Sequence, residues 1–272
     1  MRFNDKLIGA SKKNDSLLCI GLDPDAEKIP SFLRDADDPI FEFNKRIIDS
    51  TKDLVIAYKP NLAFYEALGL HGLQSLAKTL RYIPSDIPVI ADAKRGDVEH
   101  SAKAYAKAVF EVFNFDAVTV NPYMGSDSVK PFLDYAEKGV FVLCRTSNPG
   151  SKNFQDLRCG SEKRLYEIVA EHVVGWNVNK NCGLVVGATY PEELKKIREM
   201  VGEDMPILIP GVGAQAGDLE KAVKFGTNSV GEMAIISASR VILYASNEKD
   251  FDKKARTVAN YIREDINQFR FR

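Results

Sequence analysis

Two aspartates and a lysine lie within six residues in the stretch VIADAKRGDVEHS, which covers residues 89–101. Asp92 and Lys94 come at the end of an apolar run, and Asp97 follows three residues later. Side chains two residues apart in a strand point to the same side, so Asp92 and Lys94 are expected to face one space. A buried ionic cluster stabilises a fold poorly and more often marks a functional site. An ion pair that serves only packing is the structural alternative.

A second lysine is expected beside these residues. Lys59 lies in the apolar run LVIAYKPN (54–61), and the next apolar run along the chain carries Asp92. If the two runs form neighbouring strands, Lys59 and Lys94 would alternate with Asp92 and Asp97 in a space that holds little water. Two carboxylates could hold Mg²⁺. The lysine between them offsets part of their attraction for a cation, so no metal is expected.

Composition excludes several classes of protein. The chain has 272 residues, of which 45% are hydrophobic and 28% are charged, and its net charge is −1. These values are typical of a soluble globular protein and argue against dedicated binding to nucleic acid or to a membrane. The first residues lack the apolar segment of a signal peptide, and no apolar run is long enough to span a bilayer. Four cysteines without a CxxC pair favour a reduced, cytoplasmic protein without a zinc site.

Eight short apolar runs recur along the chain and are expected to form parallel strands. Each run is rich in Val, Ile or Leu and nearly continuously apolar, as strands buried on both faces are. The runs are 16–23, 54–61, 88–94, 117–123, 139–146, 182–189, 206–213 and 228–236. Amphipathic helices are expected between them, among them 39–53, 101–114, about 162–178 and 191–201. Eight strand–helix units without a linker predict a single-domain α/β protein, one (β/α)8 TIM barrel over residues 1–272. An open doubly wound sheet is the alternative, but no GxGxxG follows the first run.

Polar side chains follow almost every run, at the end of a barrel where chemistry is located. Asp23 follows the first run, and Asn121 ends the fourth. The stretch 145–162 after the fifth run is polar and is punctuated by glycine and proline, as an active-site lid would be. A surface loop would have the same composition. Thr189 with Glu192 predicts a capping box at the start of the helix over 191–201.

A phosphate site is expected after the seventh and eighth runs. The loop PGVGAQAGD (210–218) leaves backbone N–H groups free to approach an anion. Ser239 and Arg240 follow the eighth run and can add N–H groups and a guanidinium. A phosphate site at this place is common in TIM barrels.

Six motifs in the same order resemble those of the orotidine 5'-phosphate decarboxylase family. DAKRGD (92–97) fits the Asp-x-Lys-x-x-Asp signature of that family. The others are GLDPD (21–25), YKPN (58–61), TSNPG (146–150), PGVGAQAGD (210–218) and Ser239-Arg240. The residues of KRGD and TSNPGS are similar to those of the longer bacterial subgroup of this family. The resemblance implies decarboxylation of orotidine 5'-phosphate to uridine 5'-phosphate, the last step of de novo pyrimidine nucleotide synthesis, without a cofactor and in a homodimer with shared active sites.

The resemblance also implies a role for each matching residue. Lys94 corresponds to the proton donor to C6 of the pyrimidine, and Asp92 to the carboxylate that crowds the departing carboxyl group. Lys59 and Asp97 complete the charged array, with Asp97 reaching into the site of the partner subunit. The remaining positions imply contacts with substrate: Asp23 and, across the dimer, Ser101 with the ribose, Ser147 with the pyrimidine, Gln215, Ser239 and Arg240 with the phosphate, and Pro149 with the substrate.

The implied reaction explains why two carboxylates would surround an ammonium. Loss of the carboxyl group leaves negative charge on a vinyl carbon, which Lys94 can stabilise and protonate. Two alternatives stay open from the sequence. One is a sister decarboxylase of the same barrel that acts on a 3-keto sugar phosphate with magnesium. The other is a non-catalytic barrel that binds a phosphosugar and needs no Lys94.

Overall fold

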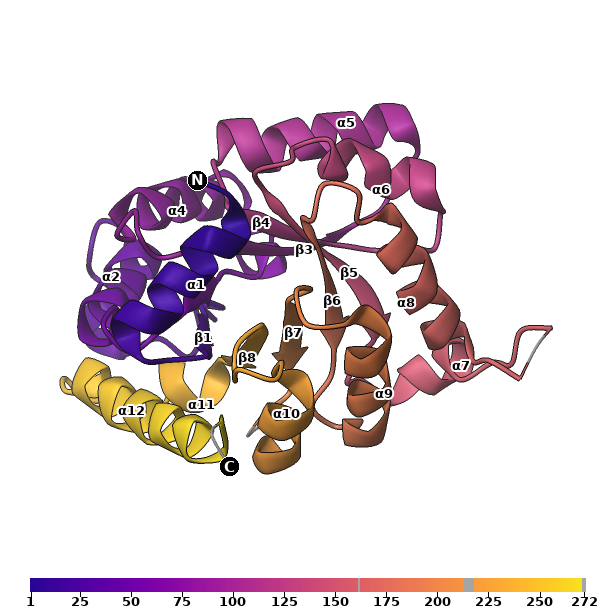
Figure 1. The fold of residues 1–272 in the computed structure, drawn as a ribbon. Helices are drawn as coiled ribbons and strands as arrows, with labels where there is room; N and C mark the ends of the chain where they lie inside the picture. Colours follow the sequence, from indigo (N-terminus) through magenta and orange to yellow (C-terminus); the bar gives the residue numbers. More distant parts are fainter. Residues whose placement is uncertain (161, 213–217, 271–272) are drawn as a thin grey trace.

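The computed structural model describes residues 1–160, 162–212 and 218–270, and its strands form one closed parallel barrel (Figure 1). Along the sheet the strands follow the order β2-β1-β8-β7-β6-β5-β4-β3. Backbone bridges join Tyr58 to Val89 and Asn61 to Asp92, and these bridges connect β2 with β3. The predicted barrel is therefore confirmed, and the open doubly wound sheet is wrong, because an open sheet would leave these two strands apart. The strands are β1 (Leu18–Gly21), β2 (Ala57–Lys59), β3 (Ile90–Arg95), β4 (Ala117–Val120), β5 (Gly139–Arg145), β6 (Cys182–Val186), β7 (Ile207–Pro210) and β8 (Ala234–Ala238).

Helices alternate with the strands and surround the barrel (Figure 1). The principal helices are α1 (Phe3–Asn14), α2 (Pro39–Thr51), α3 (Leu62–Glu66), α4 (Gly69–Tyr82), α5 (Glu99–Lys107), α6 (Ser126–Leu133), α7 (Lys152–Gln155), α8 (Leu165–Trp176), α9 (Pro191–Val201), α10 (Leu219–Gly226), α11 (Arg240–Leu243) and α12 (Phe251–Arg270). A π-helical turn, Ala108–Val112, extends α5. Short 3₁₀ turns lie at Ser31–Leu33 and Pro149–Ser151.

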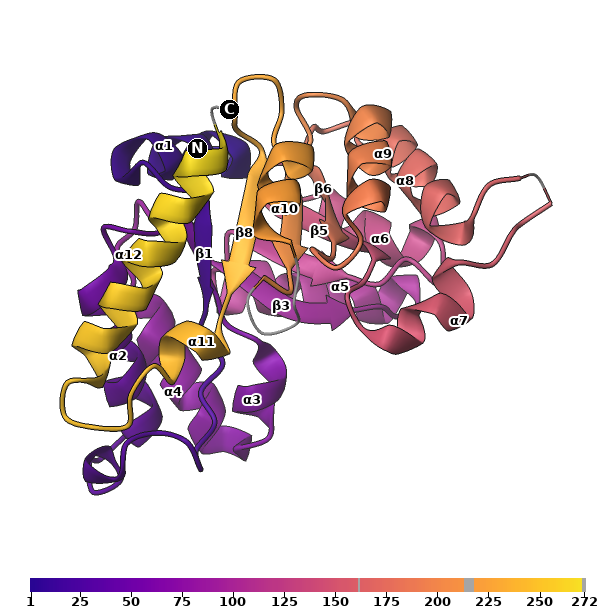
Figure 2. The same ribbon diagram turned by 90° about the horizontal axis from the view of Figure 1, so that it is seen from below.

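Helix α1 lies at the amino-terminal end of the strands, opposite the arrowheads (Figure 2). The ring of Phe3 packs edge-on against Phe141 of β5, with 5.7 Å between the ring centroids. Gly139 permits this approach, because a Cβ atom there would lie 2.6 Å from the Phe3 ring. The aromatic contact holds α1 against this end of the barrel. The carboxyl ends of the strands, near α3 and α11, are therefore the end at which a substrate can enter.

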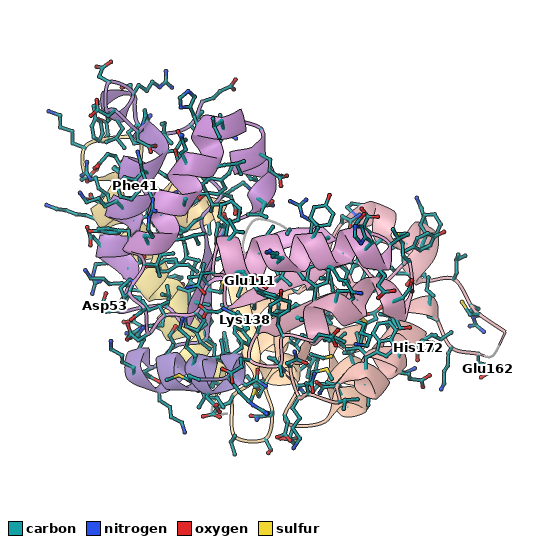
Figure 3. All side chains as sticks on the ribbon, turned by 90° about the horizontal axis from the view of Figure 1, so that it is seen from above. Phe41, Asp53, Glu111, Lys138, Glu162 and His172 are labelled. Carbon is teal, nitrogen blue, oxygen red and sulfur yellow. The ribbon has the colours of Figure 1, made fainter. Side chains whose placement is uncertain are left out.

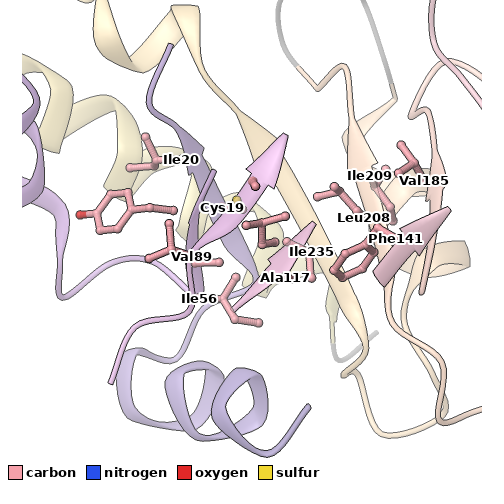
Figure 4. Packing of buried hydrophobic residues seen from close by; sticks show 14 of the residues in the cluster. Cys19, Ile20, Ile56, Val89, Ala117, Phe141, Val185, Leu208, Ile209 and Ile235 are labelled. Carbon is pink, nitrogen blue, oxygen red and sulfur yellow. The ribbon is translucent and has the colours of Figure 1, made fainter. Parts of the chain in front are cut away.

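Side chains from opposite strands fill the barrel interior (Figure 4). Cys19, Phe141, Leu208 and Ile235 are all fully or almost fully buried, as the layered packing of this fold requires. Gly183 on β6 makes room for Phe141, since a Cβ atom at this glycine would lie 2.6 Å from that ring. The interior is thus a packed core rather than a channel, and the charged residues are restricted to its carboxyl end.

Two local expectations are wrong, each because a polar side chain bonds elsewhere. Strand β8 begins at Ala234 rather than 228, since the Asn228 side chain accepts hydrogen bonds from Val230 N and Glu232 N and turns the chain before the strand. The expected capping box of Thr189 and Glu192 is absent from the described N-terminus of α9, whose N-cap is Tyr190. The Thr189 hydroxyl donates instead to the carbonyl oxygen of Ser147, 3.5 Å away.

Candidate active site

A carboxylate bridges two lysines at the carboxyl end of the barrel. The Asp92 Oδ2 atom lies 2.7 Å from Lys59 Nζ, and the other oxygen of Asp92 accepts a hydrogen bond from Lys94 Nζ. The Lys59 side chain is 7% exposed, whereas that of Lys94 is 49% exposed. Lys59 therefore holds the carboxylate from inside the barrel, and the Lys94 ammonium faces the open end.

The charges of this cluster keep each other ionised. Burial opposes the charged form of Asp92, but Lys59 and Lys94 outweigh it and hold the pKa of this carboxyl well below its usual range. Burial likewise opposes the charged form of Lys59, but Asp92 and Asp23 outweigh it and raise the pKa of this lysine. The stability that the lowered pKa of Asp92 contributes is lost only at acid pH, where the carboxylate becomes protonated. The stability that the raised pKa of Lys59 contributes is lost only at alkaline pH, where the ammonium loses its proton. Both groups therefore stay charged throughout the neutral range.

An irregularity in β3 aims the Lys94 side chain. The register between β3 and β4 shifts between Ala91 and Arg95, and Lys94 lies in the left-handed region with φ +48°. The Thr119 hydroxyl oxygen on β4 accepts hydrogen bonds from Ala93 N at 3.0 Å and from Lys94 N at 2.9 Å. The same oxygen lies 3.2 Å from Asp92 Oδ1. Thr119 therefore supports the backbone and the carboxylate of the cluster together.

Asp23 and Ser239 meet where β1 and β8 end. The Ser239 hydroxyl donates to Asp23 Oδ2 at 2.7 Å, and Asn61 N donates to Asp23 Oδ1 at 3.1 Å. Gly21 is required at this junction, because a Cβ atom there would lie 2.9 Å from Ser239 Cβ. The hydroxyl of Tyr244 donates to the carbonyl oxygen of Asp23 at 3.1 Å. The carboxylate of Asp23 is thus fixed by two segments, and Tyr244 holds the backbone of the same residue.

Two residues expected to contact the substrate, Ser147 and Pro149, lie after β5. Ser147 is partly buried, and its backbone packs against Gly187, where a Cβ atom would lie within 2.8 Å of it. Pro149 is exposed and begins the 3₁₀ turn that follows. The far end of the expected lid, at Glu162, projects away from the barrel (Figure 3). The lid stays a prediction, with Ser147 at its beginning packed against Gly187 at the end of β6.

Three expected residues lie apart from the cluster. The Asp97 carboxylate accepts a hydrogen bond from Val98 N at 2.8 Å, and among the described residues no ion pair joins it to Lys59 or Lys94. Ser101 lies in the first turn of α5, and Arg240 begins α11 with an exposed side chain. Gln215 lies outside the described residues.

No group of three or more His, Cys, Asp and Glu side chains suitable for a metal ion occurs in residues 1–160, 162–212 and 218–270. In the same part of the chain, every helix is too short or too polar to cross a lipid bilayer.

Sequence reasoning missed Thr119 and Tyr244. Thr119 lies two residues before Asn121, so the alternation of strand side chains could have placed it on the inner face. Tyr244 lies in the connection after α11, far from Asp23 in sequence, and no motif near it indicates that its hydroxyl reaches the end of β1.

The fold and the cluster together define a (β/α)8-barrel protein with a lysine–aspartate–lysine site at the carboxyl ends of its strands. The chain belongs to the orotidine 5'-phosphate decarboxylase / HUMPS family, whose model matches residues 16–253.

Curated relatives and solved structures agree with this membership. An orotidine 5'-phosphate decarboxylase of Dehalococcoides mccartyi is 48% identical over 275 residues, which cover 100% of both chains. That of Cupriavidus taiwanensis is 50% identical over 272 residues, which cover 99% of each. The structure of Leishmania donovani OMP decarboxylase has a TM-score of 0.87 at 41% identity, with 100% of both chains covered. The UMP synthase of the same organism has a TM-score of 0.89 at 43% identity, and there this chain spans 57% of the larger protein.

Proposed function

We propose that the chain decarboxylates orotidine 5'-phosphate to uridine 5'-phosphate, the last step of de novo pyrimidine nucleotide synthesis. The observation that carries this proposal is the Asp92 carboxylate held between Lys59 and Lys94 at the open end of the barrel. High identity to curated orotidine 5'-phosphate decarboxylases along the whole chain supports the same reaction. Residues 1–272 act as one catalytic domain in this proposal.

The reaction breaks the bond between C6 and the carboxyl carbon and releases CO₂. The electron pair of that bond stays on C6, where the Lys94 ammonium stabilises it and then donates a proton to it. Asp92 faces the departing carboxylate and destabilises it by repulsion, since its own charge is fixed by the two lysines. Lys94 regains its proton from water, so the site returns to its starting state.

Repulsion by Asp92 cannot account for catalysis alone. Two unit charges about 4 Å apart interact by roughly 4 kcal/mol at an effective dielectric constant near 20. Enzymes that catalyse very slow reactions lower the barrier by on the order of 20 kcal/mol. The remainder comes from charge stabilisation by Lys94, from exclusion of water, and from binding energy at the phosphate.

The remaining site residues bind the parts of the substrate that do not react. Asp23 binds the ribose hydroxyls, Ser147 binds the pyrimidine, and Pro149 contacts the substrate beside it. Gln215, Ser239 and Arg240 bind the phosphate. The contact of Asp23 with Ser239 supports this arrangement, because it brings the ribose and phosphate ends of the site together.

Two chains share their active sites in this proposal, with Asp97 and Ser101 completing the site of the partner. The bond of Asp97 to its own Val98 N, outside the lysine cluster, supports such a role. Val98 and Tyr105 on the same segment are exposed and apolar, which favours burial against a second copy. The buried thiols of Cys19, Cys144 and Cys182 are free and support a reducing compartment, so we propose that the chain lies in the cytoplasm.

Turnover of orotidine 5'-phosphate tests the proposed function directly. Release of CO₂ and formation of uridine 5'-phosphate are expected at the same rate with and without EDTA. A rate that EDTA abolishes would contradict a reaction without a metal, and turnover of a 3-keto sugar phosphate with magnesium, but not of orotidine 5'-phosphate, would point to the sister decarboxylases instead. No turnover by folded protein would contradict the proposal and leave a phosphosugar-binding barrel.

Arg240→Ala is expected to lower kcat/KM for orotidine 5'-phosphate by about 10- to 100-fold, the range for hydrogen bonds to a charged group. The reason is its position directly after β8, where a guanidinium can bind the substrate phosphate. Steady-state kinetics with orotidine, which lacks the phosphate, should give the same slow rate for the variant and the wild type.

Arg81→Ala is the matched control, since this exposed arginine lies in the last turn of α4, at the opposite end of the barrel. Arg81→Ala should leave the steady-state rates with orotidine 5'-phosphate and with orotidine unchanged. An unchanged rate of Arg240→Ala with the phosphorylated substrate would refute the phosphate contact.

A further inference from the structure

Arg145 is fully buried, although it is charged and ends a strand at the open end of the barrel. Its side chain is 0% exposed. The guanidinium donates from Nη1 to Ser151 Oγ at 2.7 Å and to Gln155 Oε1 at 3.2 Å. From Nη2 it donates to Asp156 Oδ2 at 3.3 Å. All three partners belong to the segment 146–156 that follows β5, so one side chain binds the far end of that segment back to its beginning.

Hydrogen bonds of Gln155 close this link into a ring. Gln155 Oε1 accepts from Thr146 N at 2.9 Å, and Gln155 Nε2 donates to the Thr146 hydroxyl at 2.9 Å. The same Oε1 atom is the acceptor for Arg145. The two ends of the segment are therefore joined both by the guanidinium and by the amide of Gln155.

Tyr190, which lies between β6 and α9, contacts this hydrogen-bonded ring. The Arg145 guanidinium carbon lies 3.6 Å from the centroid of the Tyr190 ring, and the Tyr190 hydroxyl lies 3.4 Å from Ser151 Oγ. A planar guanidinium can stack on a ring and donate in a fork at the same time, which a lysine ammonium cannot do. This environment is therefore specific for arginine.

Ser147 lies within the segment that the ring fixes. Its backbone rests on Gly187, and its carbonyl oxygen accepts from Thr189 at 3.5 Å. The contacts at Gly187 and Thr189 hold Ser147 from one side. The hydrogen-bonded ring of Arg145, Gln155 and Thr146 restrains the chain before and after it. Among the described side chains, those of Thr146 and Gln155 would still join the two ends of the segment without Arg145.

We propose that Arg145 is a positioning residue for pyrimidine recognition, which holds Ser147 in place by tying the two ends of the 146–156 segment together. The inference rests on the proposed function, in which Ser147 binds the pyrimidine. Arg145 touches neither the substrate nor the lysine cluster in this role. Its loss should therefore weaken recognition of the base and spare recognition of the ribose and phosphate.

Binding of two ligands to Arg145→Met separates positioning from general damage. The dissociation constant of uridine 5'-phosphate, measured by calorimetry, should rise about tenfold or more, which is within the range for side chains in one hydrogen-bond network. That of ribose 5-phosphate, which lacks the base, should change by less than about twofold. Arg145→Lys should give an intermediate loss for uridine 5'-phosphate, because it keeps the charge but not the fork.

Arg164→Met is the matched control. Arg164 Nη1 lies 3.4 Å from the same Asp156 carboxylate, but its side chain is partly exposed and does not bond Ser151 or Gln155. It should leave the binding of both ligands unchanged. Gln155→Ala serves as the second variant where Arg145→Met does not fold, since it opens the ring at a partly exposed side chain, and it should give the same selective loss.

A double-mutant cycle with Ser147→Ala tests whether the effect passes through Ser147. Arg145→Met should weaken uridine 5'-phosphate binding by less than about threefold in the Ser147→Ala background. The inference is overturned if Arg145→Met weakens the binding of both ligands equally. It is also overturned if Arg145→Met weakens uridine 5'-phosphate binding as strongly in the Ser147→Ala background as in the wild type. Failure of the proposed function is a separate result, because wild-type protein would then neither bind uridine 5'-phosphate nor turn over orotidine 5'-phosphate.

Discussion

Lys94→Ala is expected to reduce decarboxylation by at least about a thousandfold while the barrel stays folded. Two contributions are lost together: the charge that stabilises the electron pair on C6, and the proton that ends the reaction. Lys59 cannot replace them, because its ammonium is buried behind Asp92 and bonded to it. The measurement is the rate of CO₂ release under saturating substrate, with circular dichroism to verify the fold.

The fold should survive because the Lys94 side chain is half exposed, and because Asp92 keeps its bond to Lys59 after the change. Lys224→Ala is a suitable control, since Lys224 also pairs with a carboxylate, that of Glu220, but on the surface of α10. It should retain full activity. A Lys94→Ala protein that keeps more than about a tenth of wild-type turnover, a loss below about 1.4 kcal/mol, would contradict the role of Lys94.

The barrel could be predicted because its strands are buried on both faces. Such strands have continuous apolar runs, and each of the eight runs contains or overlaps a strand of the structure. The spacing of apolar residues predicted helix α9 with its observed bounds, and in the structure Pro191 begins this helix and Gly202, with φ +72°, ends it. Boundaries failed where a side chain bonds locally, as Asn228 does before β8.

Part of the site could be predicted, and the reason for the rest is geometric. The expected meeting of Asp92 and Lys94 is seen in the structure, but regular alternation is not its cause. Lys94 has a left-handed backbone at a register shift, which strand periodicity does not indicate. The burial of Arg145 was likewise not predictable, since its partners come from a loop and from Tyr190. Spacing identifies which residues lie at strand ends, but not how irregular backbone turns them.

Mixing two inactive variants is expected to restore about a quarter of wild-type activity, if Asp97 acts in the partner's site. Asp97→Ala and Lys94→Ala should each be nearly inactive alone. After subunit exchange, about half of the dimers are mixed, and each contains one site with Lys94 from one chain and Asp97 from the other. That site is native, whereas the second site of the same dimer lacks both groups.

The control mixes Lys94→Ala with Asp92→Ala, two variants whose lesions lie in the same active site. The two residues bond within one chain, so every site in a mixed dimer keeps one of the two lesions. This mixture should stay at the activity of its parents, with exchange verified by mass spectrometry of differently tagged chains. Recovery only with Asp97→Ala would then place that carboxylate across the dimer axis. Parental activity in both mixtures after complete exchange would show that Asp97 serves its own chain, and its bond to Val98 N would have to break to reach the lysines.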